Sequence, residues 1–345
     1  MSEMSYLEKL LDGVEVEWKT LGEVAKYVRG LIYSKSSESA DGQGYKVLRA
    51  NNITLSNNCL NLNDVKVVRF DTKVKSSQKL YKNDILISAA SGSREHVGKV
   101  AYIESDIDYY FGGFMGVVRC DEKLNPRYLF HVLTSDIFQK YLDEMLNSST
   151  INNLNSAVMG RFKIPLPCPD NPEKSLAIQS EIVRILDKFT ALTAGLTAEL
   201  SMRKKQYNYY RDQLLSFKEG EVEWKALGEI GEVRMCKRIL KSQTSSEGEI
   251  PFYKIGTFGK EPDSYISRKL FNEFKEKYSY PKVGEVLISA SGTIGRTVIF
   301  DGRESYFQDS NIVWIENNEK IVLNKYLFYF YKIAKWGISE GGTIK

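Results

Sequence analysis

The sequence predicts an α+β protein in which two similar α/β domains are separated by a long helix of the coiled-coil type. Three observations lead to this prediction. A ten-residue opening occurs twice, as EVEWKTLGEV at residues 15–24 and as EVEWKALGEI at residues 221–230. Further matches follow each opening in the same order, and a stretch with helical spacing of its apolar residues lies between the two copies.

The matches behind the two openings indicate a repeated domain. NDILISAASG at residues 83–92 corresponds to GEVLISASG at residues 284–292, and LNPRYLF at residues 124–130 corresponds to LNKYLF at residues 323–328. Shorter matches join GKVAYI (98–103) with GRTVIF (295–300), and SSTI (148–151) with GGTI (341–344). Because the order is kept through each copy, a chance resemblance of two short motifs does not explain it.

Each copy reads as strands with one flanking helix. Short Val, Ile, Leu and Tyr runs alternate with Gly, Asn, Asp and Ser, which is typical of strands and turns. Residues 126–146 carry apolar side chains at helical spacing, which predicts an amphipathic helix against the sheet. The segments directly after the two openings share a polar, glycine-containing loop but few side chains. This suggests one task performed on two different targets, although unconstrained loops could also diverge.

The segment between the copies predicts a single long helix. Asn171 can cap it, Pro172 suits the first helical position, and Glu173 suits the positive end of the helix dipole. Roughly 40 helical residues would span roughly 60 Å, so such a helix needs another long helix to cover its apolar stripe. The residues expected to pair, in steps of three and four with one stutter, are Ile178, Ile182, Ile185, Phe189, Leu192, Leu196, Leu200, Tyr207, Tyr210 and Leu214.

The expected domain order is that of a circular array. Leu10-Leu11 matches Leu214-Leu215, so the N-terminus resembles the end of the same helix. The second copy stops at GGTIK, where the first copy continues into its helix, so we expect a C-terminally truncated chain that could borrow a helix from a second copy. The expected boundaries are a helix tail at 1–14, a first domain at 15–170, the helix at 171–219 and a truncated second domain at 220–345.

The composition is that of an ordinary soluble protein. Hydrophobic residues make up 42% and charged residues 27%, and we see neither an apolar run of membrane-spanning length nor a signal peptide. Cys59, Cys120, Cys168 and Cys236 lack metal-ligand spacing, which favours reduced thiols in the cytoplasm and no metal site. The net charge of +4 permits nucleic-acid binding without arguing for it.

The assembled motifs resemble the DNA-specificity subunit of type I restriction–modification enzymes. The resemblance rests on three motifs: the openings at Trp18 and Trp224, LISASG followed by a Gly-Lys or Gly-Arg pair, and STINNLNSAVMGRFKIPLP followed by AIQSEIVRILDKF. The resemblance covers nearly the whole chain. It implies two target-recognition domains that each read half of a split double-stranded DNA sequence, with long helices that set the gap and dock methyltransferase subunits. It also implies that methylation with S-adenosylmethionine, and cleavage by a restriction (translocase and nuclease) subunit, belong to the partners.

The sequence shows no catalytic residues of its own. An N/D-P-P-Y/F methyltransferase motif is missing, and NPRY at residues 125–128 is better explained as a helix start. PDNPEK at residues 169–174 has its acid and lysine adjacent, which a helix cap explains better than a nuclease site. We therefore expect a non-enzymatic subunit without a cofactor.

Residue types that suit DNA cluster after strand-like runs and around the glycine turns. Arg and Lys pair with guanine, Asn and Gln with adenine, and Ser and Thr with phosphate. Any one of these side chains could equally be solvated surface, so the prediction rests on the clusters. The candidates are Arg49, Asn51, Asn52, Ser91, Ser93, Arg94 and Lys99 in the first copy, and Lys237, Arg238, Lys241, Lys254, Thr257, Lys260, Thr293 and Arg296 in the second.

Two kinds of function remain open at this stage. The first is a DNA-recognition subunit that directs its partners to a two-part sequence. The second is a coiled-coil scaffold whose paired α+β domains bind proteins. Binding of random duplex DNA that does not weaken with salt would count against the first.

Overall fold

The computed structural model describes residues 13–54, 56–147, 153–218 and 220–336. It divides into two compact units, residues 1–197 and 198–345, which are described separately below. The segments expected to match at 148–151 and 341–344, and most of the expected helix tail at 1–14, lie outside the described residues. No helix in the described ranges combines the length and apolar character that a membrane span requires.

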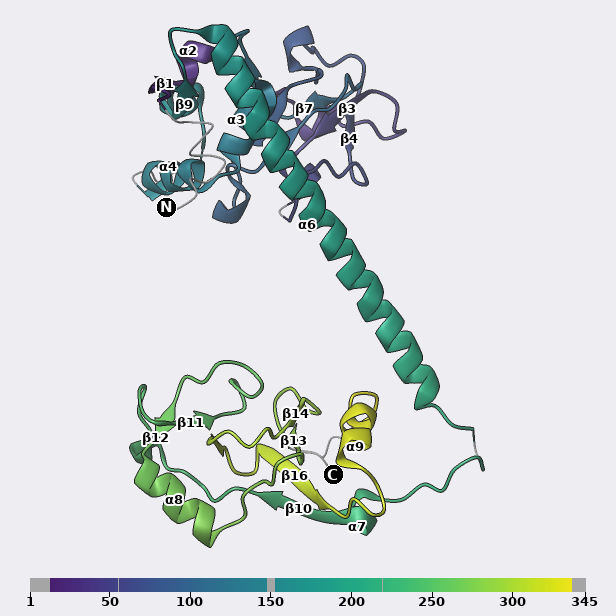
Figure 1. Ribbon diagram of the computed structural model, residues 1–345. Coiled ribbons are helices and arrows are strands. Elements are labelled where there is room, and N and C mark those ends of the chain that lie inside the picture. The colour runs from purple at the N-terminus through teal and green to yellow at the C-terminus, as the bar shows by residue number, and fades with distance from the viewer. Residues whose placement is uncertain (1–12, 55, 148–152, 219, 337–345) are drawn as a thin grey trace. The chain divides into compact units, whose positions relative to one another are not determined.

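The first unit contains a four-stranded sheet, a three-stranded sheet and a two-stranded ribbon, with strand orders β2-β8-β5-β6, β4-β3-β7 and β1-β9 (Figure 1). The strands are β1 (Val16–Thr20), β2 (Ala25–Arg29), β3 (Tyr45–Leu48), β4 (Lys66–Val68), β5 (Ile85–Ser88), β6 (Val100–Tyr102), β7 (Tyr110–Phe111), β8 (Met115–Cys120) and β9 (Lys163–Pro167). The α-helices are α2 (Leu21–Val24), α3 (Pro126–Leu133), α4 (Asp136–Asn147) and α5 (Ser156–Arg161). The long helix α6 (Pro172–Leu214) begins in this unit and ends in the second. Short 3₁₀ turns are η1 (Lys35–Ser37), η2 (Ala50–Asn52), η3 (Ser76–Gln78) and η4 (Arg94–His96).

The central strand β5 is buried on both faces. Ile85 and Ile87 pack into the cluster formed with α3 and α4, whereas Leu86 packs into the cluster that contains Leu48 and Phe111 of the three-stranded sheet. Alternate side chains of a strand point to opposite faces, so the apolar run predicts a strand covered on both sides. The structure confirms this prediction for residues 85–88.

The predicted helix over residues 126–146 is two helices, α3 and α4, so the prediction of one helix was wrong. The break lies at Thr134 and Ser135, whose hydroxyls donate to the backbone oxygens of His131 (3.0 Å) and Val132 (2.7 Å). Such local side-chain bonds compete with the backbone bonds of a continuing helix. Apolar spacing continues across the break because both helices pack on the same face of the sheet.

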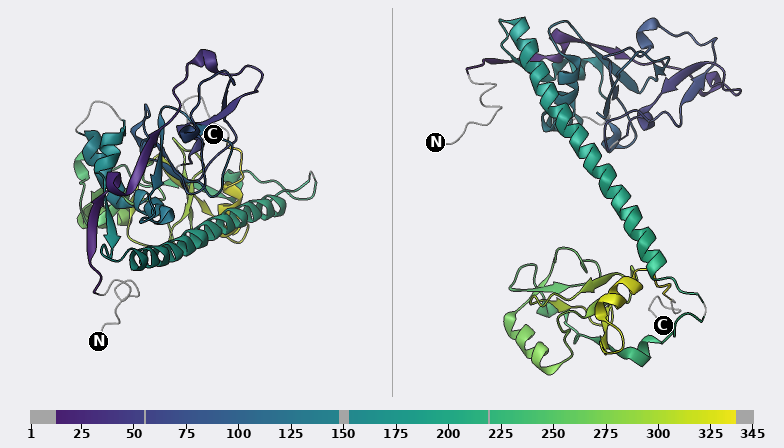
Figure 2. Two further views of the ribbon diagram at one scale, coloured as in Figure 1. Left: turned by 90° about the horizontal axis from the view of Figure 1, so that it is seen from above. Right: turned by 45° about the vertical axis from the view of Figure 1, so that its right-hand side comes forward.

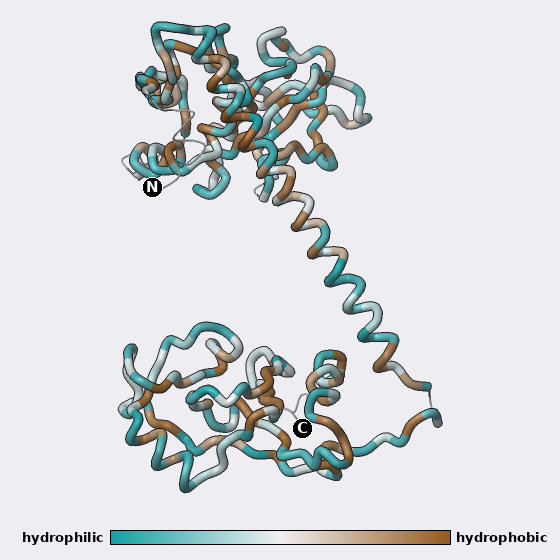
Figure 3. Tube along the Cα trace, in the orientation of Figure 1, coloured by the Kyte–Doolittle hydropathy of each residue, from teal (hydrophilic) through white to brown (hydrophobic). Residues whose placement is uncertain are grey.

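The long helix α6 begins as predicted, with Pro172 first and the Asn171 side chain accepting from the Lys174 N–H at 3.0 Å. Its first turns pack on the first unit. Ile178 is buried in the core, and Ile182 packs against it. These two residues therefore fill the domain core instead of pairing with a second long helix, because the short helix α3 of the same unit lies against this part of α6. From Phe189 to Leu200 the apolar stripe is exposed, and Figure 3 shows it as repeated brown segments along the helix.

Polar contacts also fix the start of α6 on α3. The Gln179 side chain accepts from the Asn125 N–H at 2.8 Å, and Asp187 lies 3.0 Å from Arg127 Nε and 2.8 Å from His131 Nε2. Burial lowers the pKa of His131, and Asp187 opposes that effect. His131 is thus a structural residue of this contact.

The second unit repeats the architecture of the first. Its sheets have the orders β10-β16-β13-β14 and β12-β11-β15, which match β2-β8-β5-β6 and β4-β3-β7. The strands are β10 (Gly231–Met235), β11 (Ile250–Tyr253), β12 (Tyr265–Ile266), β13 (Val286–Ser289), β14 (Thr297–Ile299), β15 (Tyr306–Phe307) and β16 (Ile312–Asn317). The helices are α7 (Leu227–Ile230), α8 (Arg268–Lys277) and α9 (Asn324–Tyr331), and the 3₁₀ turn η5 lies at Lys241–Gln243. Figure 2 shows α8 in green and α9 in yellow from two further sides.

The sheet of the second unit carries a buried carboxylate. Glu285, directly before β13, accepts a hydrogen bond from the Lys282 N–H at 2.7 Å, and burial raises the pKa of Glu285. Asp84 holds the equivalent position in the first unit and pairs with Arg119 of β8. The position equivalent to Arg119 is Glu316, which instead binds Arg234 and Lys282.

Glu285→Gln is expected to raise the melting temperature of the second unit near pH 7. A carboxyl whose pKa is raised in the folded state contributes stability below its unfolded pKa, and that contribution is lost as the pH rises through the folded pKa. Glutamine keeps the acceptor for Lys282 without a charge, so the difference should vanish below about pH 4. Thermal melts of both proteins between about pH 4 and pH 7 test this prediction. The control is Glu273→Gln, at an exposed position of α8. An equal shift at both ends of the range would contradict the prediction.

Candidate nucleic-acid interface

The first unit has a cavity of about 660 Å³ where the loops after β2 and β3 meet the β7–β8 loop. Gly30 lies against that last loop, since an added Cβ would be 2.0 Å from the Gly112 oxygen. The cavity is lined by Arg29, Leu31, Ile32, Tyr33, Lys35, Glu38, Arg49, Ala50, Asn51, Ala90, Ser91, Gly112, Gly113, Phe114 and Met115. Cationic, amide, hydroxyl and aromatic groups thus share one concave surface, which suits contact with phosphates and base edges.

Three of the predicted residues lie on this cavity. Arg49 and Asn51 both contact Asp64, at 3.0 Å from Arg49 Nη2 and 3.1 Å from Asn51 Nδ2. Ser91 also lines the cavity. Within the described part of the chain, the buried Arg49 Nε has no hydrogen-bond partner.

Asn52 and Lys99 are buried and perform structural work instead. The Asn52 side chain donates to the oxygens of Asn61 (2.8 Å) and Asp64 (2.9 Å) and accepts from the Arg49 N–H (2.8 Å). Lys99 Nζ donates to the Ile53 oxygen at 3.0 Å, and burial lowers its pKa. These two side chains shape the loop from inside, which makes them unsuitable as DNA contacts.

Ser93 and Arg94 lie at the glycine turn after β5 but do not line the cavity. Both are exposed, Ser93 directly precedes η4, and Arg94 forms an ion pair with Asp143 of α4 at 2.7 Å. They lie on the surface of the first unit, and their predicted contact with DNA stays a prediction.

The cavity also contains residues that the sequence analysis missed. Arg29 ends β2, Lys35 begins η1, and Tyr33 lies between them. Ile32 and Phe114 are exposed and apolar, a residue type that does not suggest polar contacts to DNA. The GG pair before Phe114 was the available signal of a tight loop.

In the second unit, the predicted residues divide into loop cations and braces. Lys237, Arg238 and Lys241 are exposed in the loop after β10, and Arg238 Nε lies 3.1 Å from Asp309. Lys260 is also exposed. Three residues brace their loops: Lys254 pairs with Asp263 at 2.8 Å, the Thr257 hydroxyl accepts from the Lys254 N–H at 3.2 Å, and Arg296 donates to the Phe258 oxygen at 2.9 Å. Thr293 is exposed at the turn, and its main-chain oxygen accepts from the Ser289 hydroxyl at 2.5 Å.

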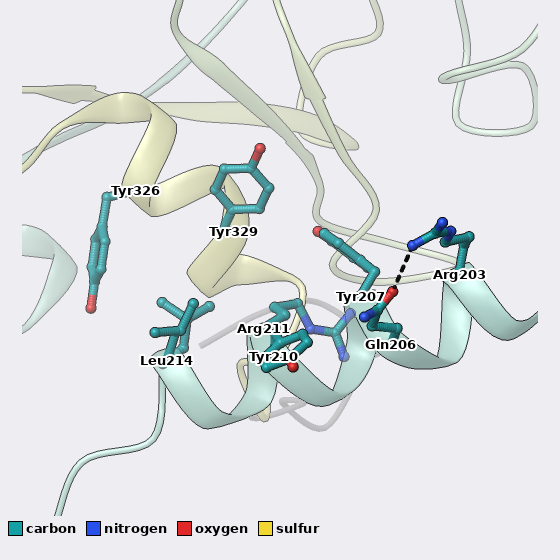
Figure 4. A pocket seen from close by; sticks show the side chains of 9 residues that line it. Arg203, Gln206, Tyr207, Tyr210, Arg211, Leu214, Tyr326 and Tyr329 are labelled. Carbon is teal, nitrogen blue, oxygen red and sulfur yellow. Dashed lines mark hydrogen bonds between the residues drawn. The ribbon is translucent and has the colours of Figure 1, made fainter.

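A second surface of interest lies in the unit that contains the end of α6. A cavity of about 490 Å³ is lined by Tyr207, Tyr210 and Leu214 of α6 and by Tyr326 and Tyr329 of α9 (Figure 4). These three α6 residues belong to the predicted pairing stripe. Their aromatic and apolar lining fits a protein contact better than a small polar ligand.

The sequence is similar to known specificity subunits of type I restriction enzymes. The family model described as the type I restriction modification DNA specificity domain matches residues 13–202 and 219–345. A Haemophilus influenzae protein named as a type I restriction enzyme specificity subunit is 47% identical over 355 residues, covering 99% of this chain and 82% of that protein. The Escherichia coli EcoR124I/EcoR124II specificity subunit is 42% identical over 259 residues, covering 74% of this chain and 57% of that protein.

Solved structures of type I restriction–modification proteins have a fold similar to that of this chain. The S subunit of a type I restriction–modification system from M. genitalium has a TM-score of 0.54 at 15% identity, with 93% of this chain and 77% of that chain covered. A chain from a study of complex assembly in a type I restriction–modification system has a TM-score of 0.55 at 16% identity, with 92% and 79% covered. The family model matches both of the repeated domains and most of the long helix between them. The chain belongs to the family of DNA-specificity subunits of type I restriction–modification enzymes, which are non-catalytic subunits.

Proposed function

We propose that each unit recognises one half of a split DNA sequence and that the chain directs methylation and cleavage by its partner subunits to that sequence. The observation that carries this proposal is the duplicated sheet order, which supports different loops after β2 and β10. A common scaffold with different surface side chains suits two different half-sequences.

The proposed DNA contacts follow from position and exposure. In the first unit they are the cavity residues Arg29, Lys35, Arg49, Asn51 and Ser91, with Ser93 and Arg94 at the neighbouring turn. In the second unit they are the exposed cations Lys237, Arg238, Lys241 and Lys260. Asn52 and Lys99 are left out because they are buried. Lys254, Thr257 and Arg296 act mainly on the loops that they brace, whereas the exposed Thr293 at the turn is retained as a proposed contact.

The proposed partners are double-stranded DNA, methyltransferase subunits, a restriction subunit and a second copy of this chain. S-Adenosylmethionine would be bound by the methyltransferase subunits. The exposed stripe from Phe189 to Leu200 supports a helical partner, because a large apolar surface on a soluble protein commonly marks an interface. Action on chromosomal DNA places the assembly in the cytoplasm.

The test of this function is the methylation pattern of cells with and without the gene. Expression together with the methyltransferase subunits should produce methylated adenines in one split motif, and deletion should remove them. An unchanged pattern would contradict the proposal. A scaffold that binds proteins would leave the pattern unchanged and would show no salt-dependent binding of duplex DNA.

Arg29→Ala and Lys35→Ala should each weaken binding to duplex DNA and reduce the salt dependence. Each lost phosphate contact lowers the slope of log K against log salt by about 0.9. Fluorescence anisotropy across a salt series measures the slope. The control is Lys163→Ala on β9, an exposed cation at the other side of the same unit (Figure 1). Equal slopes for all three variants would place DNA elsewhere.

A further inference from the structure

Two large exposed apolar side chains, Ile32 and Phe114, line the cavity in the first unit. Ile32 is 83% exposed and Phe114 is 74% exposed. A Cβ placed on Gly113 would lie 3.1 Å from Ile32 Cγ1, so Ile32 rests against the loop that carries Phe114. Single exposed apolar residues are common on proteins, but this pair lies beside the cations Arg29 and Arg49.

The backbone under both side chains is firmly held. Before Ile32, the Leu31 N–H donates to the Phe111 oxygen at 2.7 Å, and the Gly30 N–H donates to the Met115 oxygen at 3.1 Å. At the other loop, the Phe114 oxygen accepts from the N–H groups of Ala89 (2.9 Å) and Ala90 (3.1 Å). Two loops distant in sequence therefore present the pair in a defined position, which recognition of a base edge requires.

The second unit has the same two positions with polar side chains. Ser88 pairs with Met115 in the first sheet as Ser289 pairs with Ile312 in the second, so Phe114 corresponds to Asn311. The bond from the Ala290 N–H to the Asn311 oxygen at 2.8 Å repeats the one made to Phe114.

The position of Ile32 is matched in the same way. Arg29 ends β2 as Met235 ends β10, and η1 and η5 follow at the same spacing. Ile32 therefore corresponds to Arg238. The two equivalent positions thus carry apolar side chains in the first unit (Ile32 and Phe114) and polar side chains in the second (Arg238 and Asn311).

We propose that Ile32 and Phe114 are specificity-determining residues that contact the C5-methyl group of a thymine in the half-sequence bound by the first unit. Thymine is the base that offers an apolar group in the major groove, whereas the other base-edge groups there are hydrogen-bond donors or acceptors. The flanking cations Arg29, Lys35 and Arg49 suit the phosphates around that base. Arg238 and Asn311 place hydrogen-bonding groups at the equivalent positions of the second unit. This inference rests on the proposed function.

The test uses the full chain assembled with its methyltransferase subunits and duplexes that carry the split motif found in the wild-type methylome. Each thymine of one half-sequence is replaced singly by deoxyuridine, which lacks the C5-methyl group. At one position the wild-type complex should lose affinity by roughly fourfold, the value of one buried methyl group. Ile32→Ala with Phe114→Ala should weaken binding to the thymine duplex roughly tenfold and should no longer distinguish thymine from deoxyuridine there.

The control variant is Phe70→Ala, because Phe70 is an exposed phenylalanine (63%) of the same unit outside the cavity wall. It should keep the wild-type preference, and unchanged melting temperatures should exclude misfolding. A second variant, Ile32→Arg with Phe114→Asn, should bind DNA with an altered motif in the first half-sequence alone. A wild-type complex that binds equally well with deoxyuridine at every thymine of that half-sequence, or a double alanine variant that keeps the discrimination, overturns the inference. Absence of any split motif in the wild-type methylome instead overturns the proposed function.

Discussion

Replacing Leu192, Leu196 and Leu200 by aspartate should abolish methylation by the assembled enzyme while both units keep their melting temperatures. These side chains are 57%, 59% and 55% exposed on α6, so the described residues alone do not need them for folding. Covering the exposed half of one leucine contributes about 1 kcal/mol. Three leucines on each of two paired helices thus contribute about 6 kcal/mol, which corresponds to roughly four powers of ten in affinity.

The matched control places the same number of aspartates on the opposite side of the helix. With about 3.6 residues per turn, Ala191, Ala194 and Ala198 lie on the face away from the leucines. Their aspartate variants should keep assembly and methylation. Co-purification with the methyltransferase subunits and the molar mass at micromolar concentration are the measurements. A wild-type chain that is monomeric there would contradict pairing with a second copy, and a fully active leucine variant would contradict the stripe as an interface.

The main features of the fold follow from the sequence because they depend on local patterns. Asn171 and Pro172 mark the start of α6, and the repeated motifs predict two sheets of the same order. The break between α3 and α4 was missed because apolar spacing continues through it. The hydroxyls of Thr134 and Ser135 decide the break, and serine and threonine occur both inside helices and at their ends.

The candidate site was only partly predictable, because residue type does not reveal which side of a loop a residue occupies. Asn52 and Lys99 have side chains suited to DNA, yet they donate to backbone oxygens inside the loop. Ile32 and Phe114 have side chains that usually lie inside proteins. Their exposure depends on a bond between Leu31 and Phe111, residues distant in sequence, which no local pattern indicates.

The first unit also contains a buried ion pair that the second unit lacks. Asp84 is 4% exposed at its side chain and forms a two-pronged pair with Arg119, with Nε at 2.8 Å and Nη2 at 2.9 Å. Arg119 also donates to the oxygens of Ser77 and Lys79, so the pair ties β5 and β8 to the η3 turn. The second unit lacks this arrangement because Glu316 occupies the position of Arg119.

Asp84→Ala is expected to destabilise the first unit by about 3 kcal/mol, because removing one partner leaves a partly buried guanidinium uncompensated. For a unit of this size that corresponds to a fall in melting temperature of roughly 6–12 °C. Hydrogen exchange of peptides from β5 and β8 assigns the effect to the first unit. The matched control is Asp143→Ala, which breaks the exposed pair with Arg94 and should cost less than about 1 kcal/mol.

A double variant shows whether the stability comes from the ion pair itself or from the bonds that each side chain makes to the backbone. If the cost of Asp84→Ala comes from the uncompensated charge, Asp84→Ala with Arg119→Met should be less destabilised than the sum of the single variants. An additive double variant would mean that each side chain acts through its own backbone bonds, Asp84 with the Tyr81 N–H and Arg119 with the η3 turn. The buried pair would then be incidental to the stability of the sheet.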